Sequence, residues 1–383
     1  MVTYAAPLED IRFLLYELFD YEGRVHPLPG CEDASRDVVD AVLEEAAKFC
    51  VAELLPLNRT GDEEGCHFDN GVVTTPKMNE VNTRTMEFCR RWGIAEQVLD
   101  TPFPGDWPKD VAFVTSLFGY ELGRVLRAPD NRRSSQHSPE TMQICSQHWF
   151  DPLLQRFVRG MPRVTLRYGC RLDAFEQTPD GVTATLFDVA SGQRETIDAA
   201  YLVGCDGAAS TVRRVLDIAL EGKGVLGRAV NMFFKAPDLM GDCGKANGTF
   251  FLNVDGEGVW GNLRLIDPRQ GVWRLMVNEA EAGITPEAVD KEGYLRRALG
   301  RDYPVAWLDV NVWERRSVVA ASYGRGRVFL AGDSVHQVSP TGALGMNTGI
   351  GDAVDIGWKL AAVLQGWGGP RLLASYDLER RPV

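Results

Sequence analysis

The sequence lacks the patterns that mark several classes of protein. Its five histidines are scattered and do not fall at spacings that hold a metal ion. Its eight cysteines include no Cys-x-x-Cys pair, which favours free thiols in a reducing compartment over a disulfide framework. No apolar run is long enough to cross a membrane, and charged side chains stand where a secretory signal would be apolar. These absences predict a cytoplasmic protein without a metal site and without a membrane partner.

Positive charge is also scarce. The 383 residues carry 41 lysines and arginines against 53 aspartates and glutamates, a net charge of −12. Nearly all of the excess lies in residues 1–76, which hold 16 acidic and 5 basic residues. An acidic chain repels phosphate backbones, so we predict no nucleic-acid partner. At this length, with 45% hydrophobic residues, the chain can form two domains with their own cores.

The most informative stretch covers residues 326–360 and reads GRVFLAGDSVHQVSPTGALGMNTGIGDAVDIGWKL. Its apolar beginning, residues 328–331, predicts a buried parallel strand that ends at Gly332 and Asp333. Ligands of open α/β sheets lie just beyond such strand ends. Because a carboxylate there can accept hydrogen bonds from sugar hydroxyls, the pattern favours a nucleotide-type ligand.

A glycine-rich loop and then a helix follow this strand. The loop holds Pro340, and we expect the helix to begin near Asn347 or Thr348, which are common N-cap residues. The free N–H groups and the dipole of such a helix favour a negatively charged ligand. The apolar residues at helical spacing predict the buried face of the helix, namely Ile350, Ala353, Val354, Gly357, Ala361 and Leu364.

Two motifs resemble the FAD-dependent aromatic hydroxylases, the para-hydroxybenzoate hydroxylase-like flavoprotein monooxygenases. The stretch GDSVHQVSPTGALGMNTGIGDAVDIGWKLA is similar to their second FAD-binding motif. Residues 201–207, YLVGCDG, followed by Ser210 and Arg213, resemble their Asp-Gly motif. The resemblance covers about residues 77–383. It implies an α/β fold in which a Rossmann-like FAD-binding domain carries a strand-rich substrate domain.

The resemblance also implies which residues contact the cofactor. Asp333 would bind the ribitol and Pro340 would line the isoalloxazine, whereas Asp206 would lie near the pyrophosphate. The backbone of residues 345–347 would stabilise anionic reduced flavin. No catalytic side chain follows from the motifs. The residues that match cofactor-binding positions are Arg84, Gln147, Asp206, Gly332, Asp333, Pro340, Gly345, Met346 and Asn347.

The activity implied by the resemblance uses a nicotinamide and O2. NADH or NADPH would reduce FAD, which would then react with O2 to hydroxylate a small aromatic substrate. Neither the preferred nicotinamide, nor the identity of the substrate, nor the oligomeric state follows from the sequence.

The unit with which those hydroxylases begin is not recognisable here. It is a βαβ unit with a G-x-G-x-x-G turn, and none precedes Lys77. A second match, Gly222-x-Gly224-x-x-Gly227, follows a helix and leads into strands, so we do not interpret it as this fingerprint. Without the unit the pyrophosphate lacks a helix N-terminus, and we expect much less than one FAD per chain.

The position of the missing unit in the sheet can also be predicted. We expect its first strand to lie between the strands that end at Asp206 and Asp333. The resemblance also implies a further helix after Val383.

Residues 1–76 resemble a different family. An amphipathic helix after Pro7 and a second one that Ser35 caps and Pro56 ends are similar to the helical N-terminus of acyl-CoA dehydrogenases. That resemblance ends at Pro76, before any catalytic part, and so implies no acyl-CoA dehydrogenase activity. Two alternatives to a monooxygenase therefore stay open: a non-catalytic chimeric remnant, and an interaction protein that docks through this acidic helical hairpin.

These observations divide the chain into three parts. We also expect a strand over residues 163–170, where apolar and polar residues alternate. The predicted parts are a helical extension at 1–76, an FAD-binding domain at 77–101, 146–220 and 317–383 that lacks its first βαβ unit, and a substrate domain at 102–145 and 221–316.

Overall fold

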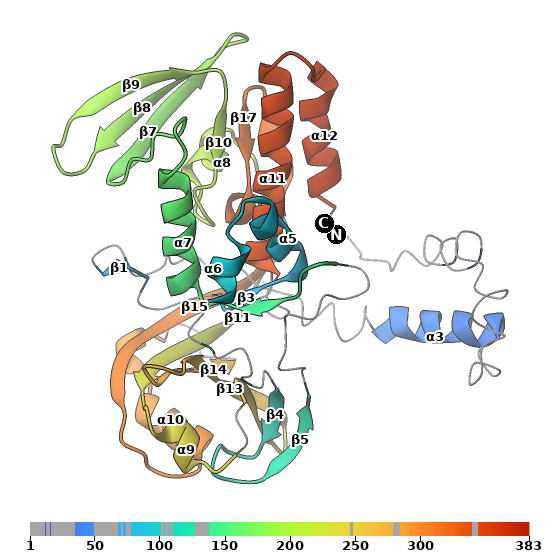
Figure 1. The fold of residues 1–383 in the computed structure, drawn as a ribbon, viewed down its shortest axis with the longest axis vertical. Coiled ribbons are helices and arrows are strands. Elements are labelled where there is room, and N and C mark those ends of the chain that lie inside the picture. The colour runs from blue at the N-terminus through green and yellow to red at the C-terminus, as the bar shows by residue number, and fades with distance from the viewer. Residues whose placement is uncertain are drawn as a thin grey trace.

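The structure is a computed structural model with a mixed α/β fold, which confirms the predicted fold class (Figure 1). A large sheet with short helices forms the lower part of Figure 1. The upper part holds long helices, an antiparallel three-stranded sheet, and a small sheet that contains two parallel strands. The structure describes residues 12, 16, 35–49, 68–69, 72–73, 78–100, 103, 107, 110–126, 138–245, 248–278, 284–338 and 344–382.

The large sheet has eight strands in the order β18-β15-β11-β14-β13-β12-β4-β5. Alternate residues of its strands, such as Val230, Met232 and Phe234, enter a core that α9 (Leu239–Asp242) and α10 (Lys291–Leu299) help to close. The strands are β4 (Val111–Val114), β5 (Glu121–Val125), β11 (Leu220–Lys235), β12 (Phe250–Asp255), β13 (Gly258–Asp267), β14 (Val272–Asn278), β15 (Ala306–Ala320) and β18 (His336–Gln337).

The glycines of the Gly222-x-Gly224-x-x-Gly227 match lie inside strand β11. The register of β11 against β15 shifts at Gly222 and again at Gly227, and Gly222 has a φ of +135°, which favours glycine. The interpretation that this match is not a dinucleotide fingerprint is confirmed.

The small sheet pairs the two strands that carry the motifs. Strand β10 (Leu202–Gly204) runs parallel to β17 (Val328–Leu330), and β16 (Gly324–Arg325) is antiparallel on the other side of β17. The two strands are therefore direct neighbours, and the expectation that a missing strand separates them is wrong. Both are short apolar runs that bury their residues against one another. Any further parallel strand would have to pair with β10 on the side away from β17.

Helix α11 (Gly345–Leu364) begins earlier and buries a different face than predicted. It starts before Asn347, and its buried residues are Asn347, Asp352, Ile356, Lys359 and Ala362. Leu364, which was expected inside, is 61% exposed. The polar residues Asp352 and Lys359 can be buried because each has ion-pair partners, which for Lys359 are Asp355 and Glu379. Helix α12 (Pro370–Arg380) packs alongside α11.

The strand expected over residues 163–170 does not form. Strand β7 begins only at Cys170, and Val164, Leu166 and Tyr168 are exposed. A strand needs a neighbour, and no described strand pairs with these residues. Between α7 (Gln147–Arg159) and α11 the remaining elements are β7 (Cys170–Gln177), β8 (Val182–Asp188), β9 (Arg194–Ala199), α8 (Thr211–Val215), η3 (Pro286–Ala288) and η4 (Gly332–Ser334).

The N-terminal part holds the helix expected after Ser35. This is α3 (Arg36–Phe49), which lies apart from both sheets in Figure 1 and is joined to Arg12 by ion pairs with Asp40 and Glu44. Apart from Arg12 and Tyr16, the helix expected after Pro7 lies outside the described residues. The elements that follow are β1 (Phe68–Asp69), β2 (Val72–Val73), β3 (Glu80–Val81), α5 (Thr83–Arg91), α6 (Ala95–Leu99) and β6 (Gln143–Ile144).

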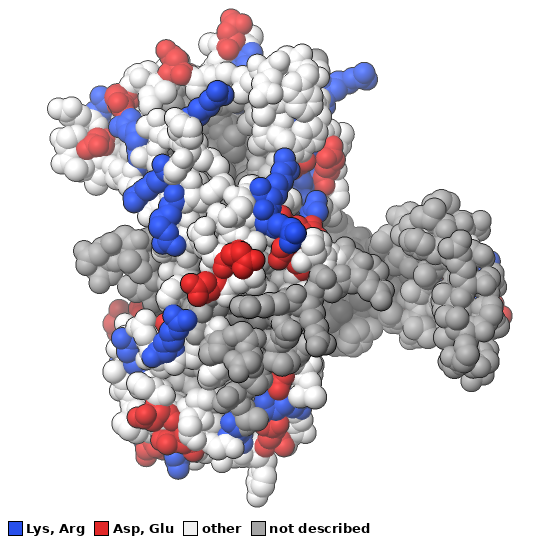
Figure 2. Space-filling view, in the orientation of Figure 1, with Lys and Arg blue, Asp and Glu red and all other residues white. Residues whose placement is uncertain are grey.

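Two of the absences predicted from the sequence can be compared with the described residues. Within them, no helix has the length and apolar character needed to cross a membrane. The same part of the chain holds no group of three or more metal-ligating side chains. Figure 2 shows acidic and basic side chains interspersed on the face it presents, without a broad basic surface among the described residues.

Candidate flavin site

The turns that follow β10 and β17 are joined by Ser334. Its hydroxyl oxygen lies within hydrogen-bond distance of the carbonyls of Gly204 (2.9 Å) and Ala331 (2.8 Å), which can share its one hydrogen, and Ser334 is fully buried. The guanidinium of Arg213 donates to the Ser334 carbonyl at 2.8 Å. Because the two strands are parallel, these contacts hold both turns at the same edge of the sheet. Asp206 and Asp333 therefore lie at neighbouring strand ends, where ligands of open α/β sheets bind.

Gly332 has a backbone conformation that favours glycine. Its φ is +66°, and its N–H donates to the carboxylate of Asp352 at 3.0 Å. A Cβ added at Gly349, in the first turns of α11, would meet the Gly332 Cα at 3.1 Å. The turn and the start of α11 are thus in backbone contact. Asp333, the next residue, is exposed at the surface of this turn.

Asp352 is fully buried and joins the turn to two other elements. One carboxylate oxygen lies 2.7 Å from Nε2 of His336, and the other accepts from Nε of Arg380 at 2.8 Å. Burial alone raises the pKa of the Asp352 carboxyl, but the bonds and charges of His336 and Arg380 outweigh it, so this pKa lies below its usual value. Asp352 therefore stays ionised and holds the Gly332 N–H in place.

Asn347 anchors the first turn of α11. Its side-chain oxygen accepts from the Asn82 N–H (2.9 Å) and the Thr85 hydroxyl (2.7 Å), and its amide donates to the Glu80 carbonyl (3.0 Å). Instead of capping its own helix, as expected, it ties α11 to the start of α5. These contacts fix the N-terminus of α11, with the backbone N–H groups of its first turn, against β3 and α5.

Asp206 caps a helix of its own. One carboxylate oxygen accepts from the Ser210 hydroxyl at 2.6 Å and the other from the Val212 N–H at 3.0 Å. Ser210 in turn accepts from the Arg213 N–H, so α8 starts where the sequence predicted. Both Asp206 oxygens are thus used within the turn. The role of Asp206 near a pyrophosphate stays a prediction.

Two of the predicted residues lie on other helices, and a third cannot be placed. Arg84 is 73% exposed on α5 and pairs with Glu87 at 2.6 Å. Gln147 opens α7, and its amide donates to Asp151 at 3.2 Å. Pro340 lies outside the described residues. The roles of these three residues, like those of the other predicted contacts, stay predictions.

The structure brings together six of the nine predicted residues, namely Asp206, Gly332, Asp333, Gly345, Met346 and Asn347. The residues that hold them, chiefly Ser334, Asp352 and Arg380, were not predicted from the sequence. One signal was available: Asp352 and Lys359 are charged residues seven apart in a largely apolar helix, and so lie on one face.

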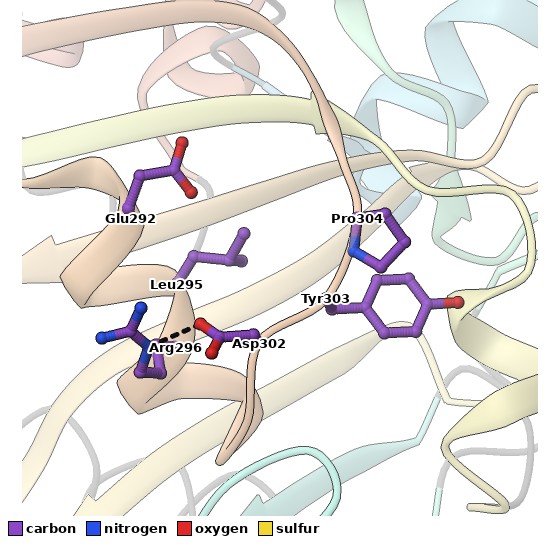
Figure 3. Close-up of a pocket in the computed structure, with 6 residues that line it drawn as sticks. All are labelled: Glu292, Leu295, Arg296, Asp302, Tyr303 and Pro304. Atoms are coloured by element: carbon purple, nitrogen blue, oxygen red, sulfur yellow. Dashed lines mark hydrogen bonds and ion pairs between the residues drawn. The ribbon is translucent and has the colours of Figure 1, made fainter.

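A pocket of about 290 Å³ lies elsewhere, beside α10 (Figure 3). An ion pair between Arg296 and Asp302, at 2.5 Å, is part of its lining, and both side chains are more than 60% exposed. Its lining comes from α10 and the segment before β15 and not from the Gly332 turn, so we do not assign it a function. Its lining residues are Glu292, Leu295, Arg296, Asp302, Tyr303 and Pro304.

Comparison with known proteins identifies the family. A sequence profile of the FAD binding domain family matches residues 69–383, so the match starts slightly before the predicted 77. A putative polyketide hydroxylase of Streptomyces halstedii is 36% identical over 82% of this chain and 57% of the relative. The 2,4-dichlorophenol 6-monooxygenase of Cupriavidus pinatubonensis is 30% identical over 82% of this chain and 54% of the relative.

Solved structures agree with the family match. The rebeccamycin biosynthetic enzyme RebC, with reduced flavin, is 40% identical, has a TM-score of 0.74, and matches over 82% of this chain and 58% of its own. Aklavinone-11 hydroxylase, in a ternary complex with FAD and aklavinone, is 30% identical, with a TM-score of 0.71 over 80% of this chain and 59% of its own.

The chain spans a little over half the length of these relatives. The prediction of FAD as the cofactor of this fold is confirmed by the family match and by the flavin in the solved neighbours. The chain belongs to the FAD binding domain family of FAD-dependent aromatic hydroxylases.

Proposed function

We propose that this chain acts as an FAD-dependent monooxygenase that hydroxylates an aromatic or phenolic substrate with NADH or NADPH and O2, in the cytoplasm. The observation that carries this proposal is the convergence of the Gly332 turn, the Asp206 turn and the N-terminus of the 20-residue helix α11 at one sheet edge. We propose that the FAD-binding domain consists of residues 77–101, 146–220 and 317–383, the boundaries predicted from the sequence.

The residues at this edge fit the needs of a flavin. The positive φ of Gly332 lets backbone approach a ligand closely, and the exposed Asp333 can accept hydrogen bonds from the ribitol hydroxyls. The N–H groups at residues 345–347 favour negative charge on the ring. A bound FAD would supply electron transfer from the nicotinamide to O2. The chain's own contribution is to bind, orient and shield the reacting groups.

Replacing Asp333 tests where the flavin binds. Because Asp333 is proposed to accept bonds from the ribitol, Asp333→Ala should abolish the FAD binding that fluorescence titration detects in the unmodified chain. Cys205→Ser serves as a control, since Cys205 is not proposed to contact the cofactor. Equal flavin retention in the unmodified chain and Asp333→Ala would remove Asp333 from the site.

Turnover tests the activity itself. In the presence of excess FAD, the protein should oxidise NADH or NADPH in air, and an aromatic substrate should raise the rate. Protein that binds FAD but never oxidises either nicotinamide would favour the non-catalytic alternative.

A further inference from the structure

A run of arginines connects helix α7 to strand β7. Residues 152–172 contain five arginines and no acidic residue, although the chain as a whole has a net charge of −12. All residues from 159 to 169, between the two elements, are exposed. The run is one narrow segment and not a broad surface. We call its five basic side chains the arginine strip, namely Arg156, Arg159, Arg163, Arg167 and Arg171.

Contacts at the end of α7 bring the strip together. The side chain of Gln155 donates to the Tyr168 hydroxyl at 2.7 Å, and the guanidinium of Arg159 lies over the Tyr168 ring, 5.8 Å from its centre. The segment after α7 therefore folds back onto the last turns of that helix. Like charges gathered in this way raise the local positive potential, which favours an anionic partner.

Only part of this positive charge is matched within the described residues. Arg167 pairs with Glu195, and Arg171 shares the carboxylate of Asp173 with Arg194. For the other three arginines of the strip, the described part of the chain supplies no carboxylate at ion-pair distance. Their charges are therefore available to an acidic partner.

The same segment exposes apolar side chains. Val164, Leu166 and Tyr168 are 44%, 38% and 61% exposed, and Met161 is 36% exposed. No described strand pairs with the segment that holds them. Exposed apolar side chains that gather among charged ones mark contact surfaces. The partner of the strip should therefore offer both acidic and apolar side chains.

The chain itself contains a segment of that kind. Residues 1–76 carry 16 acidic and 5 basic residues, and within them Asp37 and Glu44 lie seven apart on α3, and so on one face. Both are exposed, Glu44 by 54% even in its pair with Arg12, and the apolar Val38 is 48% exposed. In Figure 1, α3 and α7 lie on opposite sides of the molecule, so α3 does not cover the strip of its own chain.

We propose that the arginine strip binds α3 of a second copy of this chain. Opposite charges supply the complementarity, and the exposed apolar side chains of both segments would be buried in the contact. Because each copy has both a strip and an α3, two such contacts related by a twofold axis form a closed dimer. The proposal gives the acidic helical hairpin a partner, and it does not depend on the proposed activity.

Light scattering after gel filtration of the full chain tests the proposal. We expect a dimer at about 0.1 M salt that dissociates at about 1 M salt, because the Debye length falls from about 10 Å to about 3 Å. Arg156→Gln, Arg159→Gln and Arg163→Gln together should raise the dissociation constant of the dimer by about tenfold to a hundredfold.

A matched control removes the same charge from another exposed place. It replaces three arginines at the end of α10, and it should leave the dissociation constant unchanged. The control carries Arg296→Gln, Arg297→Gln and Arg301→Gln.

A charge swap separates this contact from any other partner. Arg156→Glu with Arg163→Glu reverses the strip, and Asp37→Lys with Glu44→Lys reverses α3. Each of these two proteins alone should be monomeric, because like charges would face one another across the contact. A mixture of the two should form dimers again, since both contacts then join opposite charges.

Several results would overturn the proposal. These are a chain that stays monomeric at 0.1 M salt, a dimer that survives reversal of the strip, and swapped proteins that do not associate when mixed. A monomeric chain that binds vesicles of anionic lipid would instead assign the strip to a membrane surface. All substituted side chains are exposed, so the melting temperatures should change little and the readout is association alone.

Discussion

The affinity for FAD should rise by about two to four powers of ten when a βαβ unit with a G-x-G-x-x-G turn from a related hydroxylase replaces residues 1–76. Two additional charge-assisted hydrogen bonds to the pyrophosphate, at about 1.5–3 kcal/mol each, are enough for that gain. The helix of the unit would add its N-terminus at the pyrophosphate. Fluorescence titration of both proteins with FAD measures the change.

The structure determines where the added strand should pair. Because β10 and β17 are already paired through Leu202 and Val328, the new strand should pair with β10 on its other side. A matched control carries the same graft with the first glycine of its turn changed to valine, which should block the approach of the pyrophosphate. A graft that gives a native circular dichroism spectrum and one gel-filtration peak, yet binds FAD no better than the unmodified chain, would show that the Gly332 turn is not the flavin site.

The local parts of this site could be predicted from the sequence. The buried strands β10 and β17 and the Ser210 cap of α8 depend on apolar runs and a capping residue that are adjacent in the chain. Such patterns depend little on the rest of the fold. The position of Asp333 after β17 followed directly from them.

The parts that depend on distant partners could not be predicted. The predicted buried face of α11 was wrong because the spacing of apolar residues cannot show which charged residues will form ion pairs. Asp352 pairs with Arg380, and Lys359 pairs with Glu379. The strand expected at 163–170 was wrong for the same reason, since local alternation cannot supply a neighbouring strand. Pairing of β10 with β17 joins residues more than a hundred positions apart, and only the folded chain shows it.

Removing the carboxylate of Asp352 should have the largest effect of any single substitution in the site. Asp352→Ala leaves Arg380 without its buried partner and the Gly332 N–H without its acceptor. Breaking a buried ion pair in this way typically costs about 3–5 kcal/mol. Urea unfolding at pH 7 should show that loss, and the turn should no longer hold Asp333 for the flavin. Glu257→Ala, an exposed acid between β12 and β13, should change the unfolding free energy very little.

The same carboxylate predicts how stability depends on pH. Because the pKa of Asp352 is lower in the folded protein than in the unfolded chain, its stabilising contribution is fully present above the unfolded value of about 4. It is lost as the pH falls through the lower folded value. Between pH 6 and pH 3 the free energy of unfolding should therefore fall more steeply in the unmodified chain than in Asp352→Ala. Parallel curves for the two proteins would mean that Asp352 is not the ionised, buried partner of His336 and Arg380 that the contacts describe.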